Sequence, residues 1–275
     1  MNLHNIRKEQ FKGIFDALEE AFAAVGSDFY VIGAMARDVW YAKGNKTSRM
    51  TYDTDLAVLV GNQQEYEAIK EYLRTHENFV DPKGNSFVML SPDGHQVDIL
   101  PFGGVEIDDA VAISGDGISS IYVTGFREVY EAGTEEADIR GHRWNVATLP
   151  AIILLKFISF DDRPERRSKD ARDIAGIILD FFDLQPDLVY SNSDLFVDDT
   201  DTRSIKDIAA VVIGREIRAI VETNPELLDR VINILNEHIL IGEKSDFVRN
   251  MVAETNETVE TTVGYLQHLL SGITG

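Results

Sequence analysis

Apolar positions along the first 147 residues change their spacing several times, which is typical of a chain that mixes helices and strands. Residues 1–26 and 64–76 repeat apolar side chains at helical spacing. Short apolar runs predict buried strands, and an Asp-Gly turn at 92–95 predicts a hairpin. The expected strands are 28–33, 53–60, 86–91 and 96–102, and a further helix is expected at 34–42. The sequence of residues 103–147 predicts further short strands and turns.

The pattern becomes helical at about Thr148 and stays so to the end of the chain. Thr148 is the expected N-cap, and Pro150 the expected first-turn proline, of a helix that begins LPAIILLKFISF. Later helices are expected at 168–183, 204–222, 225–240, 245–256 and 257–271. The sequence therefore predicts an α/β lobe, residues 1–147, followed by a helical lobe, residues 148–275.

Composition narrows the class of protein. The 44% hydrophobic and 27% charged residues are those of an ordinary globular protein. The absence of cysteine excludes disulfides and thiol nucleophiles. The N-terminus lacks the layout of a signal peptide and no apolar run is long enough for a bilayer, so we expect a cytoplasmic protein without a membrane partner. A net charge of −21 argues against broad, non-specific binding to DNA.

Carboxylates occur inside two of the expected strands. Asp53 and Asp55 are two residues apart at a strand start and would share one face. Asp98 lies between Val97 and Ile99 in the strand 96–102. Carboxylates placed in this way need a positive partner or a hard cation such as Mg²⁺. Because Asp-x-Asp before a strand is also ordinary turn chemistry, the pair alone does not decide between these roles.

A turn made of small residues precedes these aspartates. Gly33 and Ala34 stand where a predicted strand passes directly into a predicted helix. Small residues there let the backbone approach a phosphate, and a helix N-terminus supplies N–H donors and the positive end of the helix dipole. The turn is therefore a candidate phosphate-binding element.

A lysine and two aspartates stand out in the helical part. Lys156 is the only charge in AIILLKFISF, so it either extends to the surface or faces a cleft that holds an anion. Asp170 and Asp173 are three residues apart and would share a helix face. Their alternative role is a salt bridge with Arg166, Lys169 or Arg172.

The order of these motifs resembles that of the DNA-polymerase-β-like nucleotidyltransferases: a small-residue turn, Asp-x-Asp on a strand, and a third strand carboxylate. Within this superfamily, RMTYDTDLAV (49–58) and LLKFISFDDRPERRSKDARDIAGIIL (154–179) resemble the AbiEii-like predicted nucleotidyltransferases, the toxin halves of type IV toxin–antitoxin pairs. The resemblance implies a nucleotidyltransferase-type mixed sheet and an enzyme that uses Mg²⁺, with two ions expected, to move a nucleotide from an NTP to an acceptor. The acceptor would be a tRNA, a protein or a small molecule, and a cognate antitoxin is an expected partner.

The same resemblance implies roles for individual residues. Asp53, Asp55 and Asp98 would be metal ligands, with Asp98 completing the metal site or deprotonating the acceptor. Lys156 would contact the NTP phosphates, and Asp173 would be a supporting acid in the second lobe. The residues expected to bind the nucleotide are Gly33, Ala34, Arg49, Lys156 and Arg163. Ala34 stands where the family has Gly or Ser, which keeps open a non-catalytic nucleotide- or partner-binding protein of the same fold. A second alternative is an antibiotic-type nucleotidyltransferase that modifies a small molecule.

Overall fold

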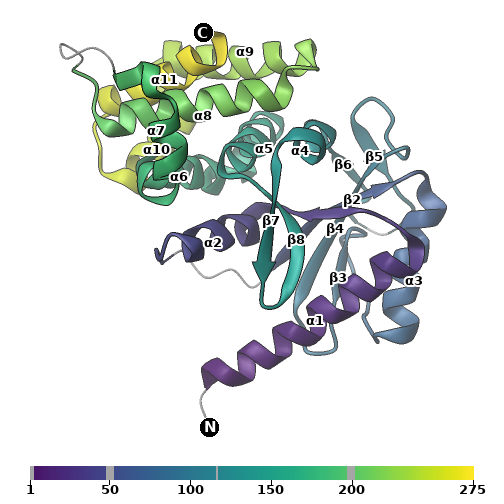
Figure 1. Ribbon diagram of the computed structural model, residues 1–275. Coiled ribbons are helices and arrows are strands. Elements are labelled where there is room, and N and C mark those ends of the chain that lie inside the picture. Colours follow the sequence, from purple (N-terminus) through teal and green to yellow (C-terminus); the bar gives the residue numbers. More distant parts are fainter. Residues whose placement is uncertain (1–2, 48–52, 116, 197–201) are drawn as a thin grey trace. The chain divides into compact units, whose positions relative to one another are not determined.

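The computed structural model describes residues 3–47, 53–115, 117–196 and 202–275, which form two compact units (Figure 1). The first unit consists of Met1–Val39, Ser48–Arg127 and Thr134–Ala147. The second consists of Trp40–Thr47, Glu128–Gly133 and Thr148–Gly275. The division of the chain at residue 147 into two domains stays a prediction.

A six-stranded mixed sheet forms the centre of the first unit. In spatial order its strands are β3 (Val88–Leu90), β4 (Gln96–Gly103), β2 (Thr54–Val60), β1 (Phe29–Val31), β8 (His142–Ala147) and β7 (Thr134–Ile139). The pairs β2–β4 and β1–β8 are parallel, and the pairs β1–β2, β3–β4 and β7–β8 are antiparallel. The prediction of a mixed sheet with flanking helices, followed by a helical part, is confirmed.

Helices α1 (Leu3–Val25) and α3 (Gln63–His76) contact each other and cover one face of this sheet. Phe15 of α1 packs edge-on against Trp144 of β8, with ring centroids 5.0 Å apart. Tyr66 of α3 donates a hydrogen bond to the carbonyl oxygen of Ile99 in β4, at 3.0 Å. Leu56 of β2 is fully buried on the same face. These contacts form the apolar core of the first unit.

The opposite face of the sheet is apolar at one end and polar at the other. Tyr30 of β1 donates a hydrogen bond to the carbonyl oxygen of Phe126 at 2.8 Å, and its ring lies 5.9 Å from that of Phe102. Helix α2 (Gly33–Lys43) begins at the polar end of this face, next to Asp55. The polar end therefore contains two of the residues that the sequence singled out, Gly33 and Asp55.

Residues 103–147 differ from the prediction in one element. They contain a separate two-stranded sheet, β5 (Ala110–Ala112) with β6 (Ser120–Tyr122), but also a helix, α4 (Phe126–Ala132). The prediction of strands and turns alone was therefore wrong. A seven-residue helix is too short to display a helical period, and it is held by tertiary contacts such as the fully buried Val129.

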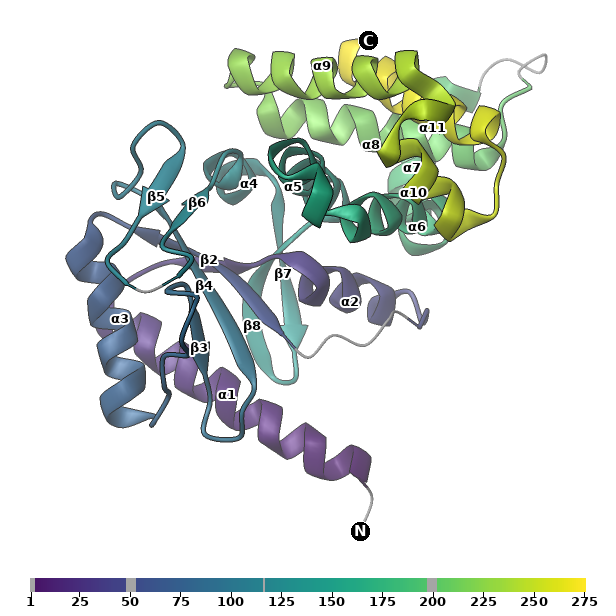
Figure 2. The ribbon, with the colours of Figure 1, turned by 180° about the vertical axis from the view of Figure 1, so that it is seen from behind.

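The second unit is built almost entirely of helices (Figure 2). Its helices after residue 148 are α5 (Leu149–Asp162), η1 (Pro164–Arg166), α6 (Ser168–Leu184), α7 (Pro186–Ser191), η2 (Ser193–Phe196), α8 (Ile205–Val221), α9 (Pro225–Ile241), η3 (Gly242–Lys244), α10 (Asp246–Thr255) and α11 (Val259–Thr274). The hydroxyl of Thr148 caps α5 by accepting a hydrogen bond from the backbone N–H of Ala151, as the sequence predicts. Within the described part of the chain, none of the helices is long and apolar enough to cross a membrane.

Candidate functional site

Asp55 and Asp98 are direct neighbours on adjacent parallel strands. The register of β2 and β4 pairs Asp55 with Asp98, and both side chains are half-buried. Paired strands lie about 4.8 Å apart, and paired residues point to the same face of the sheet. Two carboxylates from segments more than forty residues apart in the sequence thus lie side by side.

Two further polar residues extend this pair toward the strand starts. Asp53 is exposed and lies just before β2, whose first register pair is Thr54 with Val97. Gln96 is the first residue of β4 and is half-buried. We call Asp53, Asp55, Gln96 and Asp98 the polar edge. It places three carboxylates and one amide at the start of two neighbouring strands.

The glycine turn lies directly beside the polar edge. Gly33 has a φ of +63°, and a Cβ atom at this position would overlap Oδ2 of Asp55 and stand 2.9 Å from its Cγ. The backbone N–H of Ile32 donates to the carbonyl oxygen of Asp55 at 3.0 Å. Because α2 begins at Gly33, the positive end of its dipole lies next to the Asp55 carboxylate. Gly33 and Asp55, which the sequence selected separately, are in contact.

Sequence reasoning missed two polar contacts at the polar edge. The side-chain amide of Gln96 donates a hydrogen bond to Oδ1 of Asp98 at 2.8 Å. On the other face of the sheet, Nε2 of His95 lies 2.9 Å from the hydroxyl of Thr54. Burial lowers the pKa of His95, the charge of Arg140 acts in the same direction, and Asp53 opposes both. The only available sequence signal was the two-residue spacing of Gln96 and Asp98.

The donor chemistry of the polar edge fits a hard cation in part. Asp55 and Asp98 supply the paired carboxylate oxygens that Mg²⁺ prefers, and Mg²⁺ commonly binds one or two carboxylates and keeps several waters. Over the ranges that the structure describes, however, no three His, Asp or Glu side chains are arranged to hold a metal ion. The fit therefore rests on the Asp55–Asp98 pair.

Lys156 of the second unit is bonded to two carboxylates. Its Nζ lies 2.7 Å from Oδ1 of Asp170 and 2.8 Å from Oδ2 of Asp173, and all three side chains are nearly buried. Burial opposes the charge of Lys156, but the two aspartates outweigh it and raise the pKa of the lysine. Arg167 is also 3.7 Å from Asp170. Lys156 thus neither extends to the surface nor carries an uncompensated charge.

The remaining predicted nucleotide-binding residues do not all belong to one unit. Arg163 is half-buried at the C-terminus of α5, in the second unit. Arg49 lies outside the described residues. Ala34 follows Gly33 in the first turn of α2. The structure therefore brings Gly33 together with Asp55 and Asp98 in the first unit, and Lys156 together with Asp173 in the second.

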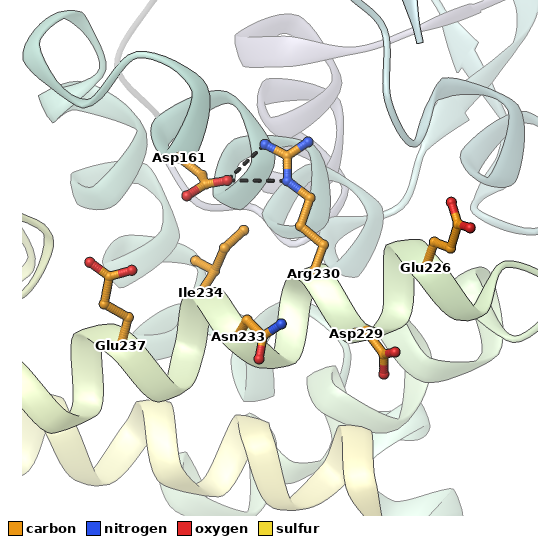
Figure 3. A pocket seen from close by; sticks show the side chains of 7 residues that line it. All are labelled: Asp161, Glu226, Asp229, Arg230, Asn233, Ile234 and Glu237. Carbon is orange, nitrogen blue, oxygen red and sulfur yellow. Dashed lines mark hydrogen bonds and ion pairs between the residues drawn. The ribbon is translucent and has the colours of Figure 1, made fainter. Parts of the chain in front are cut away.

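A pocket of about 430 Å³ in the second unit involves none of the predicted residues (Figure 3). It is lined by Asp161, Glu226, Asp229, Arg230, Asn233, Ile234 and Glu237. The guanidinium of Arg230 donates to Asp161 and Asp162, with Nη2 at 2.7 Å from each. Its positive charge is therefore already balanced by two carboxylates.

The chain matches no protein-family model and no curated protein. Three solved structures have a similar arrangement at low similarity. The solution structure of the antibiotic-resistance factor ANT(2'')-Ia is 16% identical, with 86% of this chain and 96% of that chain covered and a TM-score of 0.38. The crystal structure of ANT(2'')-Ia in complex with adenylyl-2''-tobramycin is 14% identical, with 74% and 96% covered and a TM-score of 0.39. An antigenic nucleotidyltransferase-like protein from Paracoccidioides brasiliensis is 15% identical, with 79% and 90% covered and a TM-score of 0.39. Similarities of this size establish no shared activity.

Proposed function

We propose that this chain is a Mg²⁺-dependent nucleotidyltransferase that moves a nucleoside monophosphate from an NTP to an acceptor and releases pyrophosphate. The observation that carries the proposal is the register pairing of Asp55 with Asp98 beside the Gly33 turn. Two like charges on paired strand positions repel each other. A cation held between them and a nucleotide phosphate would relieve that repulsion.

In this proposal the residues of the first unit have separate roles in cation binding, phosphate binding and proton transfer. Asp55 and Asp98 would hold Mg²⁺, and the part of Asp53 as a third ligand stays a prediction. Bound Mg²⁺ would supply charge neutralisation at the phosphates. Gly33 and Ala34 present backbone N–H groups to phosphate oxygens at the N-terminus of α2. Asp98 also accepts the proton of the acceptor hydroxyl. The hydroxyl oxygen of the acceptor attacks the α-phosphate, and pyrophosphate leaves. Catalysis is then mainly positioning and charge compensation.

Lys156 has a different standing in the proposal. The charge of Lys156 is already compensated by its ion pairs with Asp170 and Asp173. We therefore propose Lys156 as an ion-pair residue that joins α5 to α6. Three assignments stay predictions: the contact of Lys156 with NTP phosphates, the part of Asp173 as a supporting acid, and the nucleotide contacts of Arg49 and Arg163.

The test is transfer of label from each of the four NTPs with Mg²⁺. Three acceptor mixtures are supplied separately: total cellular RNA, total cellular protein and a set of aminoglycosides. Asp55→Asn should lower transfer and pyrophosphate release roughly a hundredfold or more, the usual range for removing one electrostatic contact to a transition state. Asp93→Asn, a change of the same kind at an exposed residue of the β3–β4 turn, should leave both unchanged. Equal transfer by the wild type and Asp55→Asn would exclude Asp55 from the reaction.

A second candidate function is a non-catalytic nucleotide-binding protein. The observation that favours it is Ala34, which follows Gly33 in the first turn of α2 where the family that the sequence resembles has Gly or Ser. NTP binding that depends on Mg²⁺, without pyrophosphate release in any acceptor mixture, would support this candidate. Transfer to RNA or protein would favour the toxin-like form of the enzyme, for which a cognate antitoxin is predicted. Transfer to an aminoglycoside would favour the antibiotic-type form.

A further inference from the structure

We infer that Gln96 is a positioning residue, which orients Asp98 and offsets its charge so that the polar edge can bind a divalent cation. The inference rests on the proposed function for its cation, but it concerns a residue to which no motif gives a role. It starts from one contact: the side-chain amide of Gln96 donates to Oδ1 of Asp98 at 2.8 Å.

The backbone places Gln96 within reach of Asp98. Gln96 and Asp98 are two residues apart on β4, so their side chains leave the same face of the sheet. The register also pairs Gln96 with Leu90 and Asp98 with Val88 on the neighbouring strand β3. On the β3 side these neighbours are apolar, and the Gln96 amide donates to the carboxylate of Asp98.

Charge explains why an amide suits this position. Asp53 and Asp55 lie on the adjacent segment, and Asp55 pairs directly with Asp98. A carboxylate at position 96 would add a fourth negative charge to the polar edge. A neutral amide instead donates a hydrogen bond to one oxygen of Asp98, which offsets part of the repulsion between the two paired aspartates.

The hydrogen bond also orients the carboxylate before a cation arrives. Carboxylates that ligate metals are themselves commonly hydrogen-bonded, and loss of such a partner typically weakens metal binding roughly ten- to a hundredfold. Nε2 of the neighbouring His95 is bonded to the hydroxyl of Thr54, on the other face of the sheet. We therefore assign to Gln96 a part in orienting Asp98.

Mn²⁺ binding to the full-length protein, measured by electron paramagnetic resonance and by competition with Mg²⁺, tests the inference without reference to activity. Gln96→Leu should weaken Mn²⁺ binding roughly tenfold or more. Gln267→Leu, the same substitution at an exposed residue of α11, should bind Mn²⁺ as the wild type does. Gln96→Met serves in the same way if Gln96→Leu does not fold, and circular dichroism shows which variants are folded.

A double-mutant comparison separates positioning from general damage. If Gln96 acts through Asp98, Gln96→Leu should add less than roughly a twofold loss of Mn²⁺ affinity once Asp98→Asn is present. Equal Mn²⁺ affinity of Gln96→Leu and the wild type, or an undiminished loss in the Asp98→Asn background, would overturn the inference.

Asp55→Asn distinguishes this failure from failure of the proposed function. If Asp55→Asn abolishes Mn²⁺ binding while Gln96→Leu leaves it unchanged, the role assigned to Gln96 is wrong and the proposed function stands. If Asp55→Asn itself leaves Mn²⁺ binding unchanged, the polar edge holds no cation, and both the proposed function and the role of Gln96 are overturned.

Discussion

Replacing Gly33 by alanine tests the contact on which the candidate site depends. Two costs follow from the structure. At a φ of +63°, a residue with a Cβ atom pays about 1–2 kcal/mol that glycine does not. The new Cβ would also overlap Oδ2 of Asp55, and displacing that side chain costs about 1–3 kcal/mol more. We expect Gly33→Ala to lower the free energy of unfolding of the first unit by about 2–5 kcal/mol.

Gly26→Ala is the matched control. Gly26 also has a positive φ, +77°, but a Cβ atom there would meet nothing within 4 Å. It should therefore show the backbone cost without the steric cost, about 1–2 kcal/mol. The difference between the two variants isolates the contact with Asp55.

Urea unfolding followed by the fluorescence of Trp144 is the appropriate assay. A chain with two compact units need not unfold in one step, so the probe must belong to the first unit. The protein has two tryptophans, and Trp40→Phe leaves Trp144, which is 3% exposed in β8, as the only one. All variants are compared in that background.

A double variant completes the test. Asp55→Ala removes the two atoms that a Cβ at Gly33 would meet most closely, so the cost of Gly33→Ala should fall toward that of Gly26→Ala. The reasoning is refuted if Gly33→Ala is no more destabilising than Gly26→Ala. It is equally refuted if Asp55→Ala leaves the cost of Gly33→Ala unchanged.

Two further predictions concern the second unit, and urea unfolding followed by circular dichroism checks both. Gly214→Ala should destabilise the unit by about 2–4 kcal/mol, because a Cβ atom on α8 would stand 2.9 Å from Gly272 Cα on α11, whereas Gly264→Ala, in open space on α11, should be neutral or stabilising. Lys156→Met should cost about 3–5 kcal/mol, because it leaves two nearly buried carboxylates without their lysine. Since the folded state raises the pKa of Lys156 above 10.5, its stabilisation is complete below pH 10.5 and is lost as pH rises through the higher folded value, a loss that Lys156→Met should not show.

The fold was predictable where burial imposes a period. Strands β2 and β4 alternate half-buried and buried residues near their starts, and α6 has a clear apolar face, so their spacing indicates their type. Helices α4 and α7, with seven and six residues, have too few turns to display a period. Their conformation depends on contacts that only the folded chain supplies.

The candidate site was predictable in its residue types but not in its contacts. Asp55 and Asp98 stand out because charges are rare in apolar strands, yet the spacing along the chain does not say which residue of β4 faces which residue of β2. The two-residue spacing of Gln96 and Asp98 was the only signal for Gln96, since a glutamine at a strand start is ordinary. Lys156 was recognisable as a charge in an apolar helix, but its two partners follow from the packing of α6 against α5.

The pairing of the two acids is set by the apolar face of the same strands. Leu56 of β2 and Ile99 of β4 are fully buried and are paired with each other in the register. A slip of one residue would turn every side chain of β4 to the other face and place Asp98 in the apolar layer beneath α1 and α3. The cost of burying that charge excludes the slipped register. The core therefore fixes Asp55 beside Asp98 without any attraction between them, and the polar edge is organised before a ligand binds.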